Sequence, residues 1–113
     1  MEIQYHVTQN RGCHIVMPVF SADASDPFPA RRIAAMNDFY ASMTENICTC
    51  AAALYSEFSH SRYSCLGEAF LEKNGCLTVH FRLFRRIPGQ QSVSRVIRHT
   101  WQNGLLLRQH IEQ

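Results

Sequence analysis

Arginine is the residue type whose number and spacing could do chemistry in this sequence. The chain contains ten Arg and one Lys, and half of the arginines lie close together toward the C-terminus. A guanidinium group carries forked donors that match the two oxygens of a carboxylate or phosphate. The candidate ligand-binding residues are therefore Arg82, Arg85, Arg86, Arg95 and Arg98.

The strands that carry these arginines decide what they can bind. Residues 76–86 and 91–101 are predicted to pair through a turn at 87–90, which would place Arg82 roughly opposite Arg95. Like charges directly opposite destabilise a sheet unless an anion or an acidic side chain lies between them. Glu68 and Glu72, on one face of the preceding strand, could supply that side chain. Two interpretations stay open, an acidic ligand on the arginines or a solvated face balanced by Glu.

The overall charge does not favour a nucleic-acid partner. The formal net charge is +2, which is too small to indicate a basic surface by itself. A single-stranded nucleic acid would also require exposed aromatic side chains beside the arginines. Phe84 and Trp101 are the candidates, but both fit a core equally well. We therefore expect no nucleic acid as a partner.

The cysteines and histidines form no recognised catalytic or metal-binding motif. Five Cys without a CxxC pair are typical of free thiols rather than of a disulfide framework or a zinc ribbon. No Ser-His-Asp signature, nucleophile elbow or phosphate-binding glycine loop is present. The strand residues that could in principle meet at a metal have no recognised ligand spacing; they are His14, His80, His99, Cys13, Cys65 and Cys76. We expect no metal, no cofactor and no enzymatic activity, with the histidines facing water or a neighbouring hydroxyl.

The elements that must position the arginines are organised around residues 30–59. Apolar side chains recur there every three or four positions, which predicts one apolar face of a helix about 45 Å long. They are Ile33, Met36, Tyr40, Met43, Ile47, Cys50, Leu54 and Phe58. The ridge that this face forms is expected to fill the core of the protein.

Every other segment of regular pattern reads as strand. Residues 2–8 and 13–20 are predicted to form a hairpin before the helix, and strands at 65–72, 76–86, 91–101 and 105–111 follow it. The predicted fold is α+β, with two N-terminal strands, one long helix and a four-strand antiparallel meander. We expect the helix to pack on one face of an antiparallel sheet.

The length of 113 residues predicts a single domain, 1–113, with one core. Hydrophobic residues make up 46% and charged residues 18%, as in ordinary folded domains. The sequence shows no signal peptide and no apolar run long enough to span a membrane. The expected compartment is the cytoplasm for the chain as written, or the cell exterior if the chain is a piece of a longer exported protein.

Two short motifs resemble a known family. The first is Ala34-Ala35-Met36-Asn37-Asp38-Phe39-Tyr40, and the second runs from Arg98-His99-Thr100-Trp101 to Asn103-Gly104-Leu105-Leu106. They are similar to a bacterial domain-of-unknown-function family found in the extracellular part of RsiV, the lysozyme-sensing anti-sigma factor, and beside the deacetylase domain of PdaC. The resemblance implies an α+β fold with a long helix on an antiparallel sheet, and it supplies no catalytic residues. Members carry a His-containing loop where this chain has residues 87–92 and no His.

These observations favour a non-enzymatic binding or sensing module similar to the RsiV-like domains. Its partner is unknown, with a protein or a cell-wall-related ligand as the expectation from the resemblance. The alternative is a small anion-binding or enzymatic domain that uses the arginine-rich sheet face. A homodimer formed through an uncovered sheet face is a third possibility.

Overall fold

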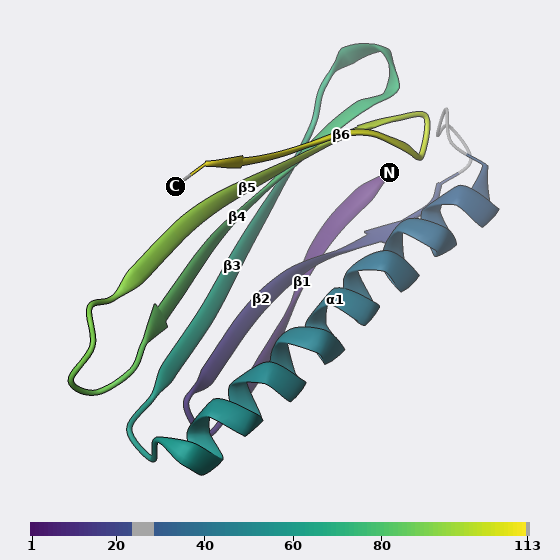
Figure 1. The fold of residues 1–113 in the computed structure, drawn as a ribbon. Helices are drawn as coiled ribbons and strands as arrows, with labels where there is room; N and C mark the ends of the chain where they lie inside the picture. The colour runs from purple at the N-terminus through teal and green to yellow at the C-terminus, as the bar shows by residue number, and fades with distance from the viewer. Residues whose placement is uncertain (24–28, 113) are drawn as a thin grey trace.

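A computed structural model describes residues 1–23 and 29–112. Within these residues one long helix and six strands follow one another in an α+β arrangement (Figure 1). The elements are β1 (Glu2–Asn10), β2 (Cys13–Ser21), α1 (Ala30–Glu57), β3 (Arg62–Leu71), β4 (Cys76–Arg86), β5 (Val93–Gln102) and β6 (Leu105–Glu112). A 3-10 turn at Lys73–Gly75 joins β3 to β4.

The strands form one sheet whose spatial order is the chain order, from β1 to β6. Neighbours pair antiparallel except β2 and β3, which run parallel from the Cys13–Tyr63 pair to the Val16–Leu66 pair. The prediction of an antiparallel sheet is therefore wrong, because the six-stranded sheet is mixed. The reason is the helix, which returns the chain from the end of β2 to its beginning, so that β3 starts beside the start of β2.

The helix covers one face of the sheet and lies along β2 (Figure 1). Its buried side chains include Met36, Tyr40 and Ile47, as the periodicity predicts, whereas Cys50, predicted on the same face, is exposed. The helix ends at Glu57, two residues before the predicted end, and the Phe58 N–H donates to the Leu54 carbonyl at 2.7 Å. We call the side of the sheet that carries α1 the helix side and the other side the open face.

Alternation along β4 shows how the two sides differ. Leu77, Val79 and Phe81 are fully buried on the helix side. The residues between them point to the open face, because successive strand side chains project in opposite directions. One core cluster joins the helix side of the strands to the apolar ridge of α1.

The third strand begins at Arg62, three residues before the predicted start. The Tyr63 N–H donates to the Gly12 carbonyl at 2.7 Å, and Tyr63 pairs with Cys13 of β2. This long-range pairing satisfies the backbone of a polar segment that has no strand pattern of its own. It also brings Arg62 into the sheet, directly opposite Arg86.

The parallel ladder between β2 and β3 stops as β2 approaches Pro18. Its last pair is Val16 with Leu66, and Pro18 has no N–H to donate. The hydroxyl of Tyr5 on β1 instead accepts a hydrogen bond of 3.0 Å from the Ala69 N–H of β3. Beyond the end of this backbone ladder, a side chain of β1 thus supplies the acceptor for the Ala69 N–H.

Candidate functional site

The register between β4 and β5 decides how the five predicted arginines are arranged. Arg82 pairs with Val96, and Arg95 pairs with Leu83. The prediction that Arg82 lies opposite Arg95 is therefore wrong, and the two guanidinium groups project from opposite faces of the sheet. The observed pairing of β4 with β5 is shifted by one residue from the predicted pairing. Because successive side chains of a strand point to opposite faces, a shift of one residue moves every side chain of the partner strand to the other face.

The five arginines consequently form two groups. Arg85 and Arg95 share the helix side with Leu83. Arg82, Arg86 and Arg98 lie on the open face, and all five side chains are exposed. The sequence identified the arginines as candidate ligand-binding residues, but it did not show that they lie on two opposite faces of the sheet.

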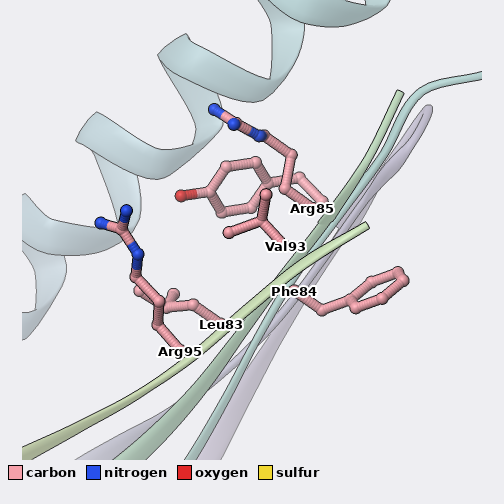
Figure 2. Close-up of a pocket in the computed structure, with 6 residues that line it drawn as sticks. Leu83, Phe84, Arg85, Val93 and Arg95 are labelled. Atoms are coloured by element: carbon pink, nitrogen blue, oxygen red, sulfur yellow. The ribbon is translucent and has the colours of Figure 1, made fainter. Parts of the chain in front are cut away.

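The helix-side pair borders a cavity of about 120 Å³ at the end of the sheet. Figure 2 shows Arg85, Val93 and Arg95 projecting toward the helix, whereas Phe84 points to the opposite side. The lining residues come from β3, β4 and β5; they are Tyr63, Leu83, Phe84, Arg85, Val93 and Arg95. The cavity therefore presents two cationic groups above a largely apolar floor.

Tyr63 adds a neutral donor to this cavity. It pairs with Arg85 across β3 and β4. Burial raises the pKa of its phenol, the nearby Cys65 and Cys50 thiols raise it further, and the positive charge of Arg85 opposes the shift. Since the pKa rises, the phenol stays protonated at neutral pH and keeps its O–H. The cavity is thus lined by donors that suit an acceptor-rich ligand.

None of the five arginines forms an ion pair with a carboxylate anywhere in residues 1–23 and 29–112. The expected partners lie elsewhere, since Glu72 follows the end of β3 and accepts a hydrogen bond of 3.4 Å from the Thr78 hydroxyl. Glu68 lies opposite His80 rather than opposite an arginine. The interpretation of a sheet face balanced by Glu pairs therefore finds no support in the described contacts.

A second hollow, of about 270 Å³, lies on the open face. It is lined by Leu66, Glu68, His80, Arg82 and Val96. A carboxylate beside an imidazole is a pattern used in acid–base catalysis. Within the described chain, however, no hydrogen bond joins Glu68 to His80, and the His80 ring lies edge-on to Phe70 with centroids 5.7 Å apart. This hollow does not contain an assembled acid–base pair.

The most strongly organised polar group is buried in the core. Tyr40 of α1 hydrogen-bonds to Nδ1 of His99 at 2.9 Å and accepts from Nε1–H of Trp101 at 2.8 Å. Burial raises the pKa of Tyr40 and lowers the pKa of His99, so both side chains are neutral near pH 7. His99 therefore faces a neighbouring hydroxyl, which is one of the two environments expected for the strand histidines. Trp101 is a core residue, which removes it as an exposed aromatic candidate.

The thiols are distributed between the core and the surface. Cys13 and Cys65 are buried, Cys48 and Cys76 are half-buried and Cys50 is exposed. Burial raises the pKa of Cys13 to about 11 and that of Cys65 to about 12, which suppresses the reactive thiolate form. In the described residues no three His, Cys, Asp or Glu side chains are grouped as metal ligands would be.

Arg62 is the surface residue that the sequence reasoning missed. It lies directly opposite Arg86 on the open face, where the two like charges face each other across β3 and β4. The argument that opposed arginines require an anion therefore applies to this pair and not to Arg82 and Arg95. No local pattern could have revealed it, because Arg62 precedes the segment with a strand pattern.

The part of the chain that the structure describes contains no helix with the length and apolar content of a membrane span. No protein-family model matches the sequence, and no curated protein matches it.

The residues that carry the sequence motifs make contacts that hold the fold together. Asn37 accepts from the Phe20 N–H at 2.9 Å and donates to the Phe20 carbonyl at 2.8 Å, which fixes α1 on β2. Arg32 donates to the Asn103 carbonyl at 2.8 Å and packs against Gly104, where an added Cβ would meet it at 2.6 Å. These roles are structural, so the motifs do not by themselves identify a ligand.

Proposed function

We propose that this protein is a non-enzymatic binding module for an acidic ligand, which it holds in the helix-side cavity. The observation that carries the proposal is the pair Arg85 and Arg95, which border one cavity and form no ion pair within the described chain. Guanidinium groups at an exposed cavity retain their capacity to bind carboxylate or phosphate oxygens in two-pronged geometry.

The rest of the cavity supports a small acidic group attached to an apolar body. The Tyr63 phenol supplies a third donor, while Leu83 and Val93 supply apolar surface. A volume of about 120 Å³ accommodates a group such as a carboxylate and its neighbouring atoms, with the rest of the ligand lying outside. The proposed ligand is therefore larger than the cavity and inserts one acidic group.

The family resemblance supports a particular set of probes. RsiV-like domains bind lysozyme or lie beside a cell-wall enzyme, and peptidoglycan fragments carry free carboxylates. We therefore propose acidic cell-wall fragments as the first ligands to test, with lysozyme as the first protein. The proposed role is sensing or recognition without chemical conversion of the ligand.

The direct test is an NMR titration of the uniformly ¹⁵N-labelled protein with soluble peptidoglycan fragments, and separately with lysozyme. We expect the largest chemical-shift changes at Tyr63, Arg85 and Arg95. The double substitution R85Q/R95Q should weaken binding at least about tenfold, because it removes two charge-assisted contacts.

The matched control is R82Q/R98Q, which removes the same charge from the open face. If R82Q/R98Q keeps its affinity for the ligand, the ligand binds in the cavity and is not held by a general attraction to positive charge on the protein. Equal loss in both variants would contradict the proposed cavity, and a turnover of the fragment in the same sample would contradict the non-enzymatic role.

A further inference from the structure

The open face carries a second surface, which is distinct from the helix-side cavity. The helix covers only the other side of the sheet (Figure 1). Phe84 lies on the open face, close to the turn between β4 and β5, and its side chain is 37% exposed. Figure 2 shows its ring projecting away from the side that carries Arg85 and Arg95. This aromatic side chain is therefore presented on the surface rather than packed in the core.

Small neighbours leave the Phe84 ring accessible. Its cross-strand partners are Ser64 on β3 and Ser94 on β5. Neither serine side chain is large enough to cover an aromatic ring, whereas bulky partners at these positions would pack against it. A partly exposed aromatic ring flanked by small residues can act as a stacking platform.

Three guanidinium groups surround this ring. Arg82 and Arg86 lie two residues before and after Phe84 on the same face of β4, and Arg62 lies directly opposite Arg86. None of the three forms an ion pair within the described residues. Opposed like charges such as Arg62 and Arg86 are stabilised when an anion lies between them.

Among the described residues, the carboxylates nearest to this surface lie at its margin. We call residues that pair across neighbouring strands a row. On β3, β4 and β5 there is no acidic residue in the row of Arg62 and Arg86 or in the row of Ser64, Phe84 and Ser94. The row of Arg82 ends at Glu112 on β6, which interacts with His110 at 3.4 Å. Glu68, in the next row on the open face, faces His80 and lines the same hollow as Arg82. The charge at the centre of the surface is therefore positive. The small net charge of the chain, from which we expected no nucleic-acid partner, does not describe this local surface.

We propose that this face binds single-stranded nucleic acid, with a base stacked on Phe84 and phosphates held by Arg62, Arg82 and Arg86. The proposal follows from the combination of groups, because an acidic peptide or a free phosphate would use the arginines but not the exposed ring. An unpaired base supplies the π-face that the ring can stack on, and the flanking phosphates supply the anions. A duplex keeps its bases stacked internally and does not offer one to Phe84.

A second exposed aromatic ring extends the same face. Phe70 is 48% exposed and lies on β3, six residues beyond the Ser64 partner of Phe84. Six residues of strand separate the two rings by roughly 20 Å. An oligonucleotide can reach both rings and a mononucleotide cannot, so the proposed ligand is a polymer.

The test is fluorescence anisotropy with labelled oligo(dT) and oligo(rU) of about ten nucleotides, at about 50 mM and about 200 mM salt. We expect binding that weakens with salt, and substantially weaker binding of a duplex of the same length. R62Q/R86Q should lower the slope of log K against log salt by about 1.4, because each lost phosphate contact on a single strand contributes about 0.7. F84L should weaken binding about tenfold with little change in this slope, since stacking is not a charge interaction.

The control R85Q/R95Q removes equal charge from the helix side and should keep its affinity for the oligonucleotide. Circular dichroism of each variant checks that the fold is retained, and R62Q/R86Q removes exposed charge without opening the core. Absence of oligonucleotide binding at about 50 mM salt would overturn the inference, and so would equal affinity for duplex together with an unaffected F84L. Loss in R85Q/R95Q alone would also overturn it, while leaving the helix-side proposal standing.

Discussion

The hydroxyl of Tyr40 on α1 lies 2.9 Å from Nδ1 of His99 on β5, inside the core. Trp101 can only donate, so the Tyr40 oxygen accepts from its Nε1–H, and the Tyr40 proton is directed to the unprotonated Nδ1 of a neutral His99. One phenol thus joins the helix to two residues of the sheet and specifies the histidine tautomer.

Replacing Tyr40 by Phe should be strongly destabilising. The substitution leaves the Trp101 Nε1–H and the His99 Nδ1 buried without their partner, which is expected to lower the free energy of unfolding by about 2–4 kcal/mol. Urea unfolding followed by fluorescence of the single Trp measures this change. Tyr55→Phe is the control, because the half-buried Tyr55 hydroxyl makes no hydrogen bond to another described residue. Its stability should change by less than about 0.5 kcal/mol, and an equal loss in both variants would contradict the role assigned to Tyr40.

The buried His99 should make stability depend on pH. Burial lowers its pKa in the folded state, so below about pH 6.5 the unfolded chain binds more protons at this residue than the folded chain does. The contribution of His99 to stability is therefore complete above that pH and is lost as the pH falls toward the lower folded pKa. Unfolding titrations between about pH 5 and pH 8 test this prediction.

His99→Gln isolates this dependence from that of the other histidines. The substitution removes the titrating group, so the decline in stability at acid pH should be smaller than in the wild type. His60→Gln, on the exposed segment after α1, should keep the wild-type profile. Identical profiles for the wild type and His99→Gln would show that other groups dominate the acid response.

Tyr5→Phe tests the hydrogen bond that the Tyr5 hydroxyl accepts from the Ala69 N–H beyond the end of the β2–β3 ladder. The variant loses the acceptor of the Ala69 N–H, at an expected cost of about 1 kcal/mol in unfolding free energy. Hydrogen exchange measured by NMR should show faster exchange of the Ala69 amide, with unchanged protection in β4 and β5. Unchanged protection at Ala69 would mean that the Tyr5 hydroxyl does not close this gap in the ladder.

Gly67→Ala tests the close approach of β3 to the core. An added Cβ would lie 2.8 Å from Phe81 Cε1 and 2.9 Å from the Val16 carbonyl oxygen. The backbone oxygen cannot yield easily, so we expect a loss of about 1–3 kcal/mol and shifted NMR signals of the Phe81 ring.

Gly89→Ala distinguishes this packing effect from backbone strain. Gly89 has a φ of +80°, and no atom lies within 4 Å of an added Cβ. Its substitution should cost about 1 kcal/mol through the backbone alone and leave the Phe81 signals unchanged. Shifted Phe81 signals in Gly89→Ala, or unshifted signals in Gly67→Ala, would contradict the predicted packing.

Local patterns were sufficient to predict the elements. Apolar residues recur every three or four positions from Met36 through Tyr40 and Met43 to Ile47, and this spacing predicted the helix and its buried face. The alternation from Leu77 to Phe81 predicted β4. Both patterns arise from the geometry of a single element, in which each side chain's direction follows from its position along the chain. The strand histidines were expected to face water or a neighbouring hydroxyl, and His99 meets the Tyr40 hydroxyl.

Pairing between distant segments could not be predicted in this way. The parallel contact of β2 with β3 depends on where α1 returns the chain, and it draws Arg62 into the sheet. A register difference of one residue moved Arg95 away from Arg82 and onto the other face. These relationships depend on turn geometry and long-range hydrogen bonds, which leave no periodic signal in the sequence.

The sequence by itself determined which residues could bind an anion, the length of the helix to within two residues and a net charge of +2. Only the tertiary structure decided that Arg85 and Arg95 share a cavity on the helix side of the sheet, while Arg62, Arg82 and Arg86 surround an exposed Phe84 on the other side. The physical reason is that net charge is a sum over the whole chain, whereas binding depends on the local field. Strand alternation and register distribute the arginines between the two faces of the sheet, and no carboxylate in residues 1–23 and 29–112 forms an ion pair with either group.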